Sequence, residues 1–185
     1  LNKMQKFKSY KTENIKEVKT YKFLSKPLNV IIREMADLKD FQLDVTWIQK
    51  KLLNKYTKKE IRSSINFLTE NGYIAVDEKG ESWLAEKQLD CIGPVFKLGL
   101  TKFHKEMFHQ AILSIDTVPS HKRSIMGHTL ALSHSQFVEL QSAINDAIDR
   151  ITKIDNKKPV NEIVYHTGFV AFPLTEFNGE ESSHE

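Results

Sequence analysis

The sequence is poor in cysteine, the residue that disulfides and thiolate zinc sites require. It holds one cysteine, Cys91, among 185 residues. A single cysteine excludes an intramolecular disulfide and a thiolate zinc cluster. No apolar run approaches the roughly 18 residues of a membrane helix, and no signal-peptide core is present. We therefore expect a cytoplasmic protein without membrane contact. Its start at Leu1, not Met, is typical of a fragment.

The charge of the chain is small overall but unevenly distributed. The formal net charge is +3. Residues 1–22 hold seven lysines and two glutamates, and residues 50–62 hold six basic residues and one glutamate, so each stretch has a net charge of +5. The tail from residue 176 holds glutamates and no base. This distribution fits either a local positive potential that attracts a polyanion or an ordinary solvated, lysine-rich surface.

Residues 23–88 have the pattern of three helices followed by a hairpin. "PLNVIIREMADL" opens with Pro27 and has apolar residues at helical spacing, which predicts the first helix. Asp44 is placed to cap a second helix over "VTWIQKKLL". A T-x-x-E capping box at Thr57 begins the third, which an Asn-Gly pair ends. "YIAV" and "SWLA" then flank "DEKG", the signature of a β-hairpin. This order is that of a winged helix.

The sequence of residues 89–176 predicts four elements in the order helix, strand, helix, strand. A Gly-Pro pair begins a long helix. In "SIMGHTLAL" (124–132), apolar and polar residues alternate and β-branched residues occur, which predicts a strand. A capping box at Ser133 begins the helix with the clearest apolar stripe of the chain. "EIVYHTGFVAFPLT" predicts a closing strand that Pro173 ends.

The sequence therefore predicts an α+β fold, with an N-terminal winged helix-turn-helix followed by a small α+β domain. A helical stripe or a sheet face must be buried against another element, so the second half is expected to be a small α+β domain packed on the winged helix. The expected parts are a basic N-terminal arm (1–22), a winged-helix domain (23–88), an α+β sensor or dimerisation domain (89–176) and an acidic tail (177–185).

The histidines and the cysteine do not form a recognisable catalytic or metal site. His104 and His109 lie five residues apart, about 140° around a helix, so they cannot easily share a metal ion. His128 shares a predicted strand face with apolar residues, which favours a hydrogen-bonded core histidine. Cys91 precedes a predicted helix start, where its pKa could fall, but no base partner is evident. No nucleophile elbow or phosphate-binding loop occurs. We expect no enzyme activity, no metal and no cofactor.

The third predicted helix carries a basic face that could contact nucleic acid. Arginine, asparagine and serine can address base edges, and nearby lysines can address phosphates. Acidic residues at the helix ends and in the hairpin oppose such contact, and many winged helices bind other proteins. The candidate DNA-binding residues are Lys50, Lys51, Lys55, Lys58, Lys59, Arg62, Ser63, Asn66 and Lys79.

Several phrases together resemble a known bacterial family. They are "LNVIIREMADLKDFQLDVTWIQKKL", "INFLTENGYIAVDEKG", "LGLTKFHKEMFHQAI", "KRSIMGHTLALS" and "EIVYHTGFVAFPLT". Over residues 21–175 the chain resembles the C-terminal region, a domain of unknown function, of predicted transcriptional regulators common in predatory and fibrobacterial lineages. The resemblance implies a role in transcription control and a Cro-repressor-like helix-turn-helix upstream, which would then be a DNA reader outside this chain.

The family resemblance supplies no established ligand or catalytic residue. The last predicted strand has His166, Gly168 and Val170 where polar amides are common in the family, so the specificity of that face is expected to differ. His104 and Arg123 are candidates for a polar cluster that binds a small molecule, and a structural hydrogen-bond network is the alternative.

Three hypotheses follow from these observations. The first is a transcriptional regulator, or its C-terminal portion, whose winged helix contacts DNA. The second is a protein-interaction module that forms a homodimer, suggested by Phe169, Phe172 and Phe177 near the closing strand. The third is a small-molecule sensor anchored by His104 and Arg123.

Overall fold

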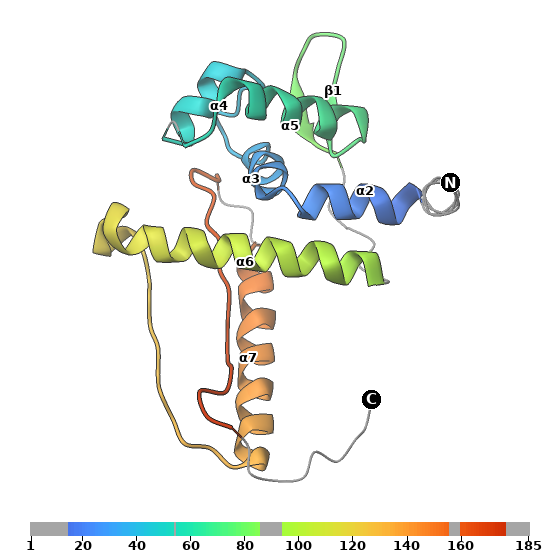
Figure 1. The fold of residues 1–185 in the computed structure, drawn as a ribbon. Coiled ribbons are helices and arrows are strands. Elements are labelled where there is room, and N and C mark those ends of the chain that lie inside the picture. The colour runs from blue at the N-terminus through green and yellow to red at the C-terminus, as the bar shows by residue number, and fades with distance from the viewer. Residues whose placement is uncertain (1–14, 54, 86–93, 156–159, 177–185) are drawn as a thin grey trace. The chain divides into compact units, whose positions relative to one another are not determined.

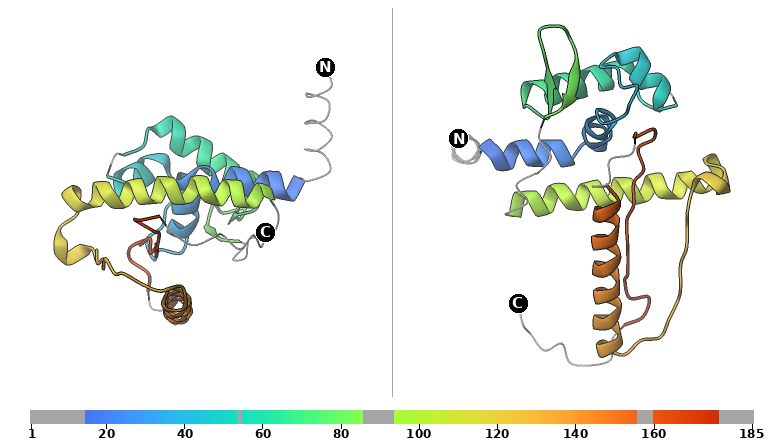
Figure 2. Two further views of the ribbon diagram at one scale, coloured as in Figure 1. Left: turned by 60° about the horizontal axis from the view of Figure 1, so that its bottom comes forward. Right: turned by 180° about the vertical axis from the view of Figure 1, so that it is seen from behind.

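The computed structural model describes residues 15–53, 55–85, 94–155 and 160–176 (Figure 1; Figure 2 gives two further views). The elements are α2 (Ile15–Leu24), α3 (Pro27–Met35), α4 (Val45–Lys51), α5 (Lys58–Glu70), β1 (Ile74–Val76), β2 (Ser82–Leu84), α6 (Pro94–Thr117), the 3-10 turn η1 (Ser120–Lys122) and α7 (His134–Asp155). The chain divides into two compact units. The first holds Leu1–Thr129 and Lys158–Val164, and the second holds Leu130–Lys157 and Tyr165–Glu185.

Several helix ends of the first unit are set by local sequence signals. Pro27 opens α3 at a position whose N–H has no helical partner. Asp44 caps α4, and its carboxylate accepts hydrogen bonds from the backbone N–H groups of Thr46 and Trp47 at 2.9 and 2.8 Å. Gly72 follows α5 with φ of +73°, a left-handed conformation that glycine adopts without strain. These expected caps are confirmed.

The core of the first unit lies where α2, α3, α4, α5 and β1 meet. Ile32, Ile48, Ile61 and Leu68 are fully buried, one or two from each of three helices. Phe23 of α2 stacks on Tyr73, with ring centroids 4.6 Å apart. The basic N-terminal region therefore contributes a helix to this core, which extends the expected three-helix bundle by one element.

The two strands form the expected antiparallel hairpin after α5. Ile74 pairs with Leu84, and Val76 pairs with Ser82. Asp77 organises the turn, because its side-chain oxygen accepts bonds from the backbone N–H groups of Lys79 and Glu81 at 2.9 and 2.8 Å. Among the described residues, this hairpin is the one β-sheet.

Helix α6 packs along α2 through a close backbone approach at Gly99. A Cβ atom at this position would lie 3.3 Å from the Cα of Tyr21 and 3.4 Å from the Cβ of Leu24. Phe96, Leu100 and other apolar residues of α6 pack against the core of the first unit. The expected boundary between the winged-helix domain and the α+β domain, at residues 88 and 89, lies outside the described residues. Helix α6, which was expected in the α+β domain, belongs to the first unit.

A segment far along the chain is tied to the loop between α3 and α4. The backbone N–H of Lys39 donates to the carbonyl of Asn161 at 3.0 Å, and the side-chain amide of Asn161 donates to Asp37 at 2.7 Å. Lys39 and Glu162 form an ion pair. This contact raises the pKa of Lys39 and lowers that of Glu162. Residues 160–164 thus leave from a fixed position on the first unit.

The prediction of two strands in the second half of the chain is wrong for the described residues. Residues 123–133 and 160–173 run without regular secondary structure and are not assigned to a sheet (Figure 1). Their composition favours extended backbone, but a strand also needs a neighbouring edge whose N–H and C=O groups complete the ladder. In the described part of the chain, neither segment forms a ladder with another strand.

In the second unit, α7 has the expected start and an apolar stripe without a buried core. The backbone N–H of Ser133 donates to the Gln136 side chain at 2.9 Å, and the backbone N–H of Gln136 donates to the Ser133 hydroxyl at 3.3 Å, which confirms the capping box. Among residues 130–154 and 165–176, no side chain is buried.

Candidate nucleic-acid interface

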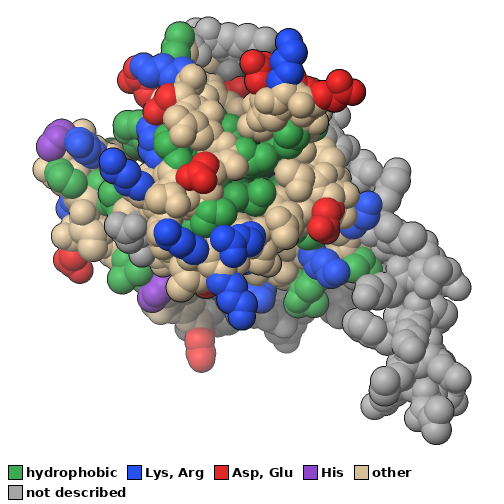
Figure 3. All heavy atoms as spheres, turned by 90° about the horizontal axis from the view of Figure 1, so that it is seen from above, with side chains coloured by type: hydrophobic (Ala, Val, Ile, Leu, Met, Phe, Trp, Pro, Cys, Tyr) green, Lys and Arg blue, Asp and Glu red, His purple; other side chains and the backbone are tan. Residues whose placement is uncertain are grey.

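The nine candidate DNA-binding residues all lie exposed on one part of the first unit. They come from the C-terminal end of α4, the loop that follows it, α5 and the tip of the hairpin. Figure 3 looks onto this end and shows Lys and Arg side chains gathered over part of it, with Asp and Glu side chains interspersed. The structure therefore presents these residues to solvent and uses none of them in the core.

The outward face of α5 combines cations with base-reading side chains. At 100° per residue, Lys59, Arg62, Ser63 and Asn66 fall within roughly 100° of one another on the helix. All four are exposed. The buried residues of α5 (Ile61, Ser64 and Leu68) lie on the other side. Such a face can meet phosphates and base edges simultaneously.

Lys51 already has partners within the first unit, which the sequence did not reveal. Its ammonium lies 2.6 Å from the Asp40 carboxylate and 4.9 Å from the Trp47 ring centroid. The Lys51 hydrogen bond holds the pKa of the Asp40 carboxyl below its ordinary value. Lys51 thus contributes less to a positive potential than Lys50 or Lys55. Asp40 lies eleven residues earlier, beyond the reach of any helical spacing rule.

The acidic residue within the basic helix has a structural role. The Glu60 carboxylate accepts hydrogen bonds from the Thr57 backbone N–H at 2.8 Å and from the Thr57 hydroxyl at 2.6 Å. These bonds complete the capping box and lower the pKa of Glu60. The carboxylate is therefore held at the start of α5, away from the face that carries Asn66.

We expect the Glu60 contribution to stability to depend on pH. Its pKa in the folded protein is below the unfolded value of about 4.3. The stabilisation is then fully present above about pH 4.3 and is lost as the pH falls through the lowered folded pKa. Glu60→Gln should be less stable than the wild type near neutral pH, and the difference should shrink below about pH 4.3. Urea unfolding, followed by tryptophan fluorescence across this pH range, measures the difference in stability between the wild type and Glu60→Gln.

Glu70→Gln is the matched control, since Glu70 is exposed at the other end of α5 and lies outside the capping box. A wild-type to Glu60→Gln difference that stays constant through the acidic range would contradict the capping role.

The two weaker ligand-binding candidates are not brought together. His104 lies 13 residues before the end of α6 at Thr117, about 20 Å along the helix axis. Arg123 follows η1 and donates a hydrogen bond to the carbonyl of Val118 at that end. His104 instead lies between two rings of its own helix, with its centroid 6.0 Å from those of Phe103 and Phe108. These contacts favour the structural alternative for both residues.

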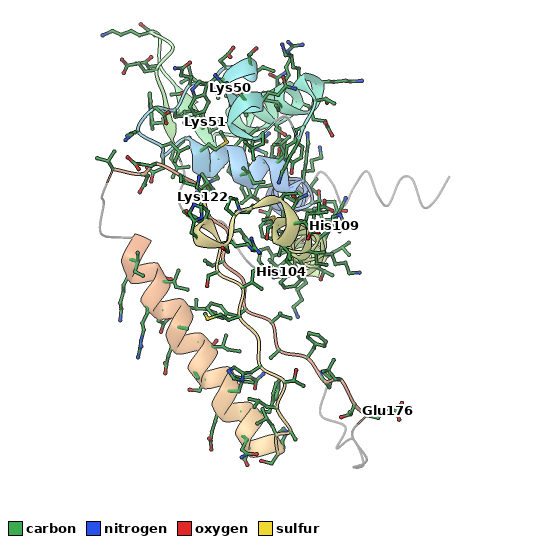
Figure 4. All side chains as sticks on the ribbon, turned by 90° about the vertical axis from the view of Figure 1, so that its left-hand side faces the viewer. Lys50, Lys51, His104, His109, Lys122 and Glu176 are labelled. Atoms are coloured by element: carbon green, nitrogen blue, oxygen red, sulfur yellow. The ribbon has the colours of Figure 1, made fainter. Side chains whose placement is uncertain are left out.

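No cluster of metal ligands lies in the described part of the chain, and its two best-formed hollows are small. No group of three or more His, Cys, Asp or Glu residues there could hold a metal ion, and His104 and His109 project from different sides of α6 (Figure 4). Cys91 lies outside the described residues. Two hollows of the first unit, of about 180 and 220 Å³, are smaller than the roughly 300 Å³ at which ligand pockets begin. Of the helices described, none combines the length and apolar character needed to cross a bilayer.

Comparison with known proteins identifies the family of the chain. A family model described as Domain of unknown function (DUF4423) matches residues 6–174. The chain therefore belongs to this family. Searches of curated proteins and of solved structures found no match.

Proposed function

We propose that this chain is part of a bacterial transcriptional regulator, in which α3, α4, α5 and the β1–β2 hairpin form a winged helix and α5 contacts DNA. The observation that carries the proposal is the outward face of α5, where Lys59, Arg62, Ser63 and Asn66 are exposed together. The proposed role is one of binding in the bacterial cytoplasm, without catalysis.

The order of elements supports the winged-helix proposal. Three helices of 9, 7 and 13 residues precede the hairpin, and the third is the longest. In helix-turn-helix proteins the recognition helix enters the major groove while neighbouring elements contact the backbone. Lys50 and Lys55 would then meet phosphates beside α5, and Lys79 would do so from the hairpin tip.

The local charges on α5 support contact with a polyanion, whereas the acidic residues of the hairpin oppose it. Glu60 is engaged in the capping box, so it opposes DNA less than its position in the sequence suggests. Glu78 and Glu81 are exposed beside Lys79. We therefore infer that α5 and the lysines before it supply most of the affinity and that the hairpin supplies little.

Charge reversal on α5 tests the proposal directly. Lys59→Glu combined with Arg62→Glu should weaken binding to duplex DNA by roughly tenfold or more and should lower the salt dependence of log K by about 2, because two phosphate contacts are lost. Fluorescence anisotropy of labelled duplex across a salt series measures both quantities.

The matched control is Lys97→Glu combined with Lys105→Glu, which changes the net charge equally on exposed positions of α6. This control should retain the wild-type salt dependence. If the wild-type chain shows no salt-sensitive duplex binding, or if both double variants lose binding equally, α5 is not the DNA-contacting element. The upstream helix-turn-helix implied by the family resemblance would then be the reader.

A further inference from the structure

A hollow of the first unit lies between α3, α6 and the loop that joins α4 to α5. Its volume is about 220 Å³. Ile31 of α3 and Met107 of α6 line it, together with Leu52 and Leu53 of the loop. All of its lining residues belong to the first unit. The site therefore stands on one compact body alone.

The hollow has the size of a side chain and not that of a cofactor or metabolite. A cavity of roughly 150 Å³ holds a benzene molecule, whereas ligand pockets begin at roughly 300 Å³. A volume of about 220 Å³ thus has room for one large apolar side chain. Met107 is 7% exposed, and Ile31 and Leu52 are half-buried, so such a side chain meets apolar surface inside. Side chains that fill small desolvated pockets supply most of the binding energy of protein interfaces.

Leu53 exposes an apolar side chain from a strained backbone. Its φ is +54°, in the left-handed region that glycine adopts freely and that leucine adopts only at a cost. The residue follows the C-cap of α4, and its N–H donates to the Lys50 carbonyl at 3.1 Å, at a kind of helix end where glycine is usual. The Leu53 side chain is 73% exposed, so the fold gains little packing in return. An apolar side chain held in this way beside an apolar hollow points to contact with another molecule.

The charges at the hollow define the chemistry of that molecule. Lys51 and Lys55 line the hollow, and no Asp or Glu occurs among its described lining residues. Lys55 is exposed, and Lys51 keeps its ion pair with Asp40. Glu60 and Glu106 line the other hollow instead. Nucleic acid has no aliphatic side chain to fill such a pocket, and lysines favour carboxylates, so the complement of this surface is a peptide with an apolar anchor beside acidic side chains.

We propose that this hollow docks an acidic peptide segment of a partner protein. The segment inserts one large apolar side chain between Ile31, Leu53 and Met107 and sets its carboxylates against Lys55 and Lys51. This inference does not rest on DNA contact by α5, because peptide binding is measured without nucleic acid.

Peptide selection on the whole chain tests the proposal. The probe is a displayed library of random peptides of about 12 residues, long enough for about three helical turns. Selected peptides should carry Asp or Glu around a large apolar anchor, and replacement of that anchor by alanine should raise the Kd roughly tenfold or more. Fluorescence anisotropy of labelled synthetic peptides measures the Kd. Enrichment of no peptide, or of neutral or basic peptides, overturns the proposal.

Leu53→Gly separates docking from folding. The substitution removes the apolar side chain and relieves the left-handed strain, so the peptide Kd should rise roughly tenfold while the urea midpoint stays equal or rises. Lys55→Glu should also raise the Kd roughly tenfold, and it should reduce the salt dependence of peptide binding. The matched controls are Leu98→Ala and Lys97→Glu at exposed positions of α6, and both should leave the Kd unchanged.

A peptide Kd that Leu53→Gly leaves unchanged, or that the controls raise equally, contradicts docking in this hollow. A labelled peptide with the sequence of residues 174–185 is the last arm of the test, since it joins Phe177 to Glu180 and Glu181. If it binds as tightly as the selected peptides and responds equally to Leu53→Gly, the occupant is the acidic tail of a second copy, and the partner proposal is overturned. Weaker binding of this peptide, or binding that Leu53→Gly does not change, supports a partner protein as the occupant.

Discussion

Leu68→Ala is expected to lower the free energy of unfolding of the first unit by about 3–4 kcal/mol. Leu68 has no exposed surface and lies on the inward face of α5, in a core that it shares with Ile32, Ile48 and Ile61. Truncation removes apolar contacts and leaves a cavity that the surrounding elements cannot close without moving together.

Urea unfolding monitored by tryptophan fluorescence measures the effect of Leu68→Ala on the first unit. Both tryptophans of the chain, Trp47 and Trp83, lie in α4 and β2, so the signal reports this unit. Leu98→Ala is the matched control, because Leu98 is 62% exposed and its truncation should cost less than about 0.5 kcal/mol. Equal costs for the two variants would contradict the assignment of the core.

Gly99→Leu is expected to destabilise the first unit by about 2–3 kcal/mol. The position allows α6 to approach α2 so closely that even a Cβ atom would be 3.3 Å from the Tyr21 backbone. A larger side chain must push the helices apart, because backbone atoms cannot rotate away as a flexible side chain can. Displacement of α2 would also disturb the Phe23–Tyr73 stack in the core.

A graded series separates the steric effect from helix propensity. Gly99→Ala should be nearly neutral, because the gain of about 1 kcal/mol from replacing glycine in a helix offsets the tight contact. Thr101→Leu, two residues along α6 and exposed, should also be nearly neutral. Urea unfolding measures the series, and amide exchange in α2 locates the change. A Gly99→Leu variant as stable as Thr101→Leu would show that the close approach is unimportant.

The caps and the hairpin could be predicted because their causes are local. Asp44, Thr57 and Ser133 each bond to backbone groups two or three residues away, and Asp77 organises its own turn. Such interactions depend on spacing along the chain and little on what packs around them. The exposure of the basic residues on α5 followed from the same helical periodicity.

The candidate ligand cluster could not be judged from the sequence, because it depended on the length and direction of α6. His104 and Arg123 are 19 positions apart. A turn between them could bring their side chains together, whereas a continuous helix keeps them apart. The helix continues to Thr117, and each residue meets its own neighbours instead.

The sequence alone determined α3, α4, α5 and the β1–β2 hairpin, the caps of the helices and the cations that face solvent, since each depends on residues within one or two turns. Only the tertiary structure decided that α6 joins α2, that Lys51 is paired with Asp40, and that Asn161 returns to Asp37 across 124 positions. It also decided that residues 124–132 and 163–172, despite their composition, are not strands. A strand is completed by hydrogen bonds to another segment, so its own residues cannot determine it.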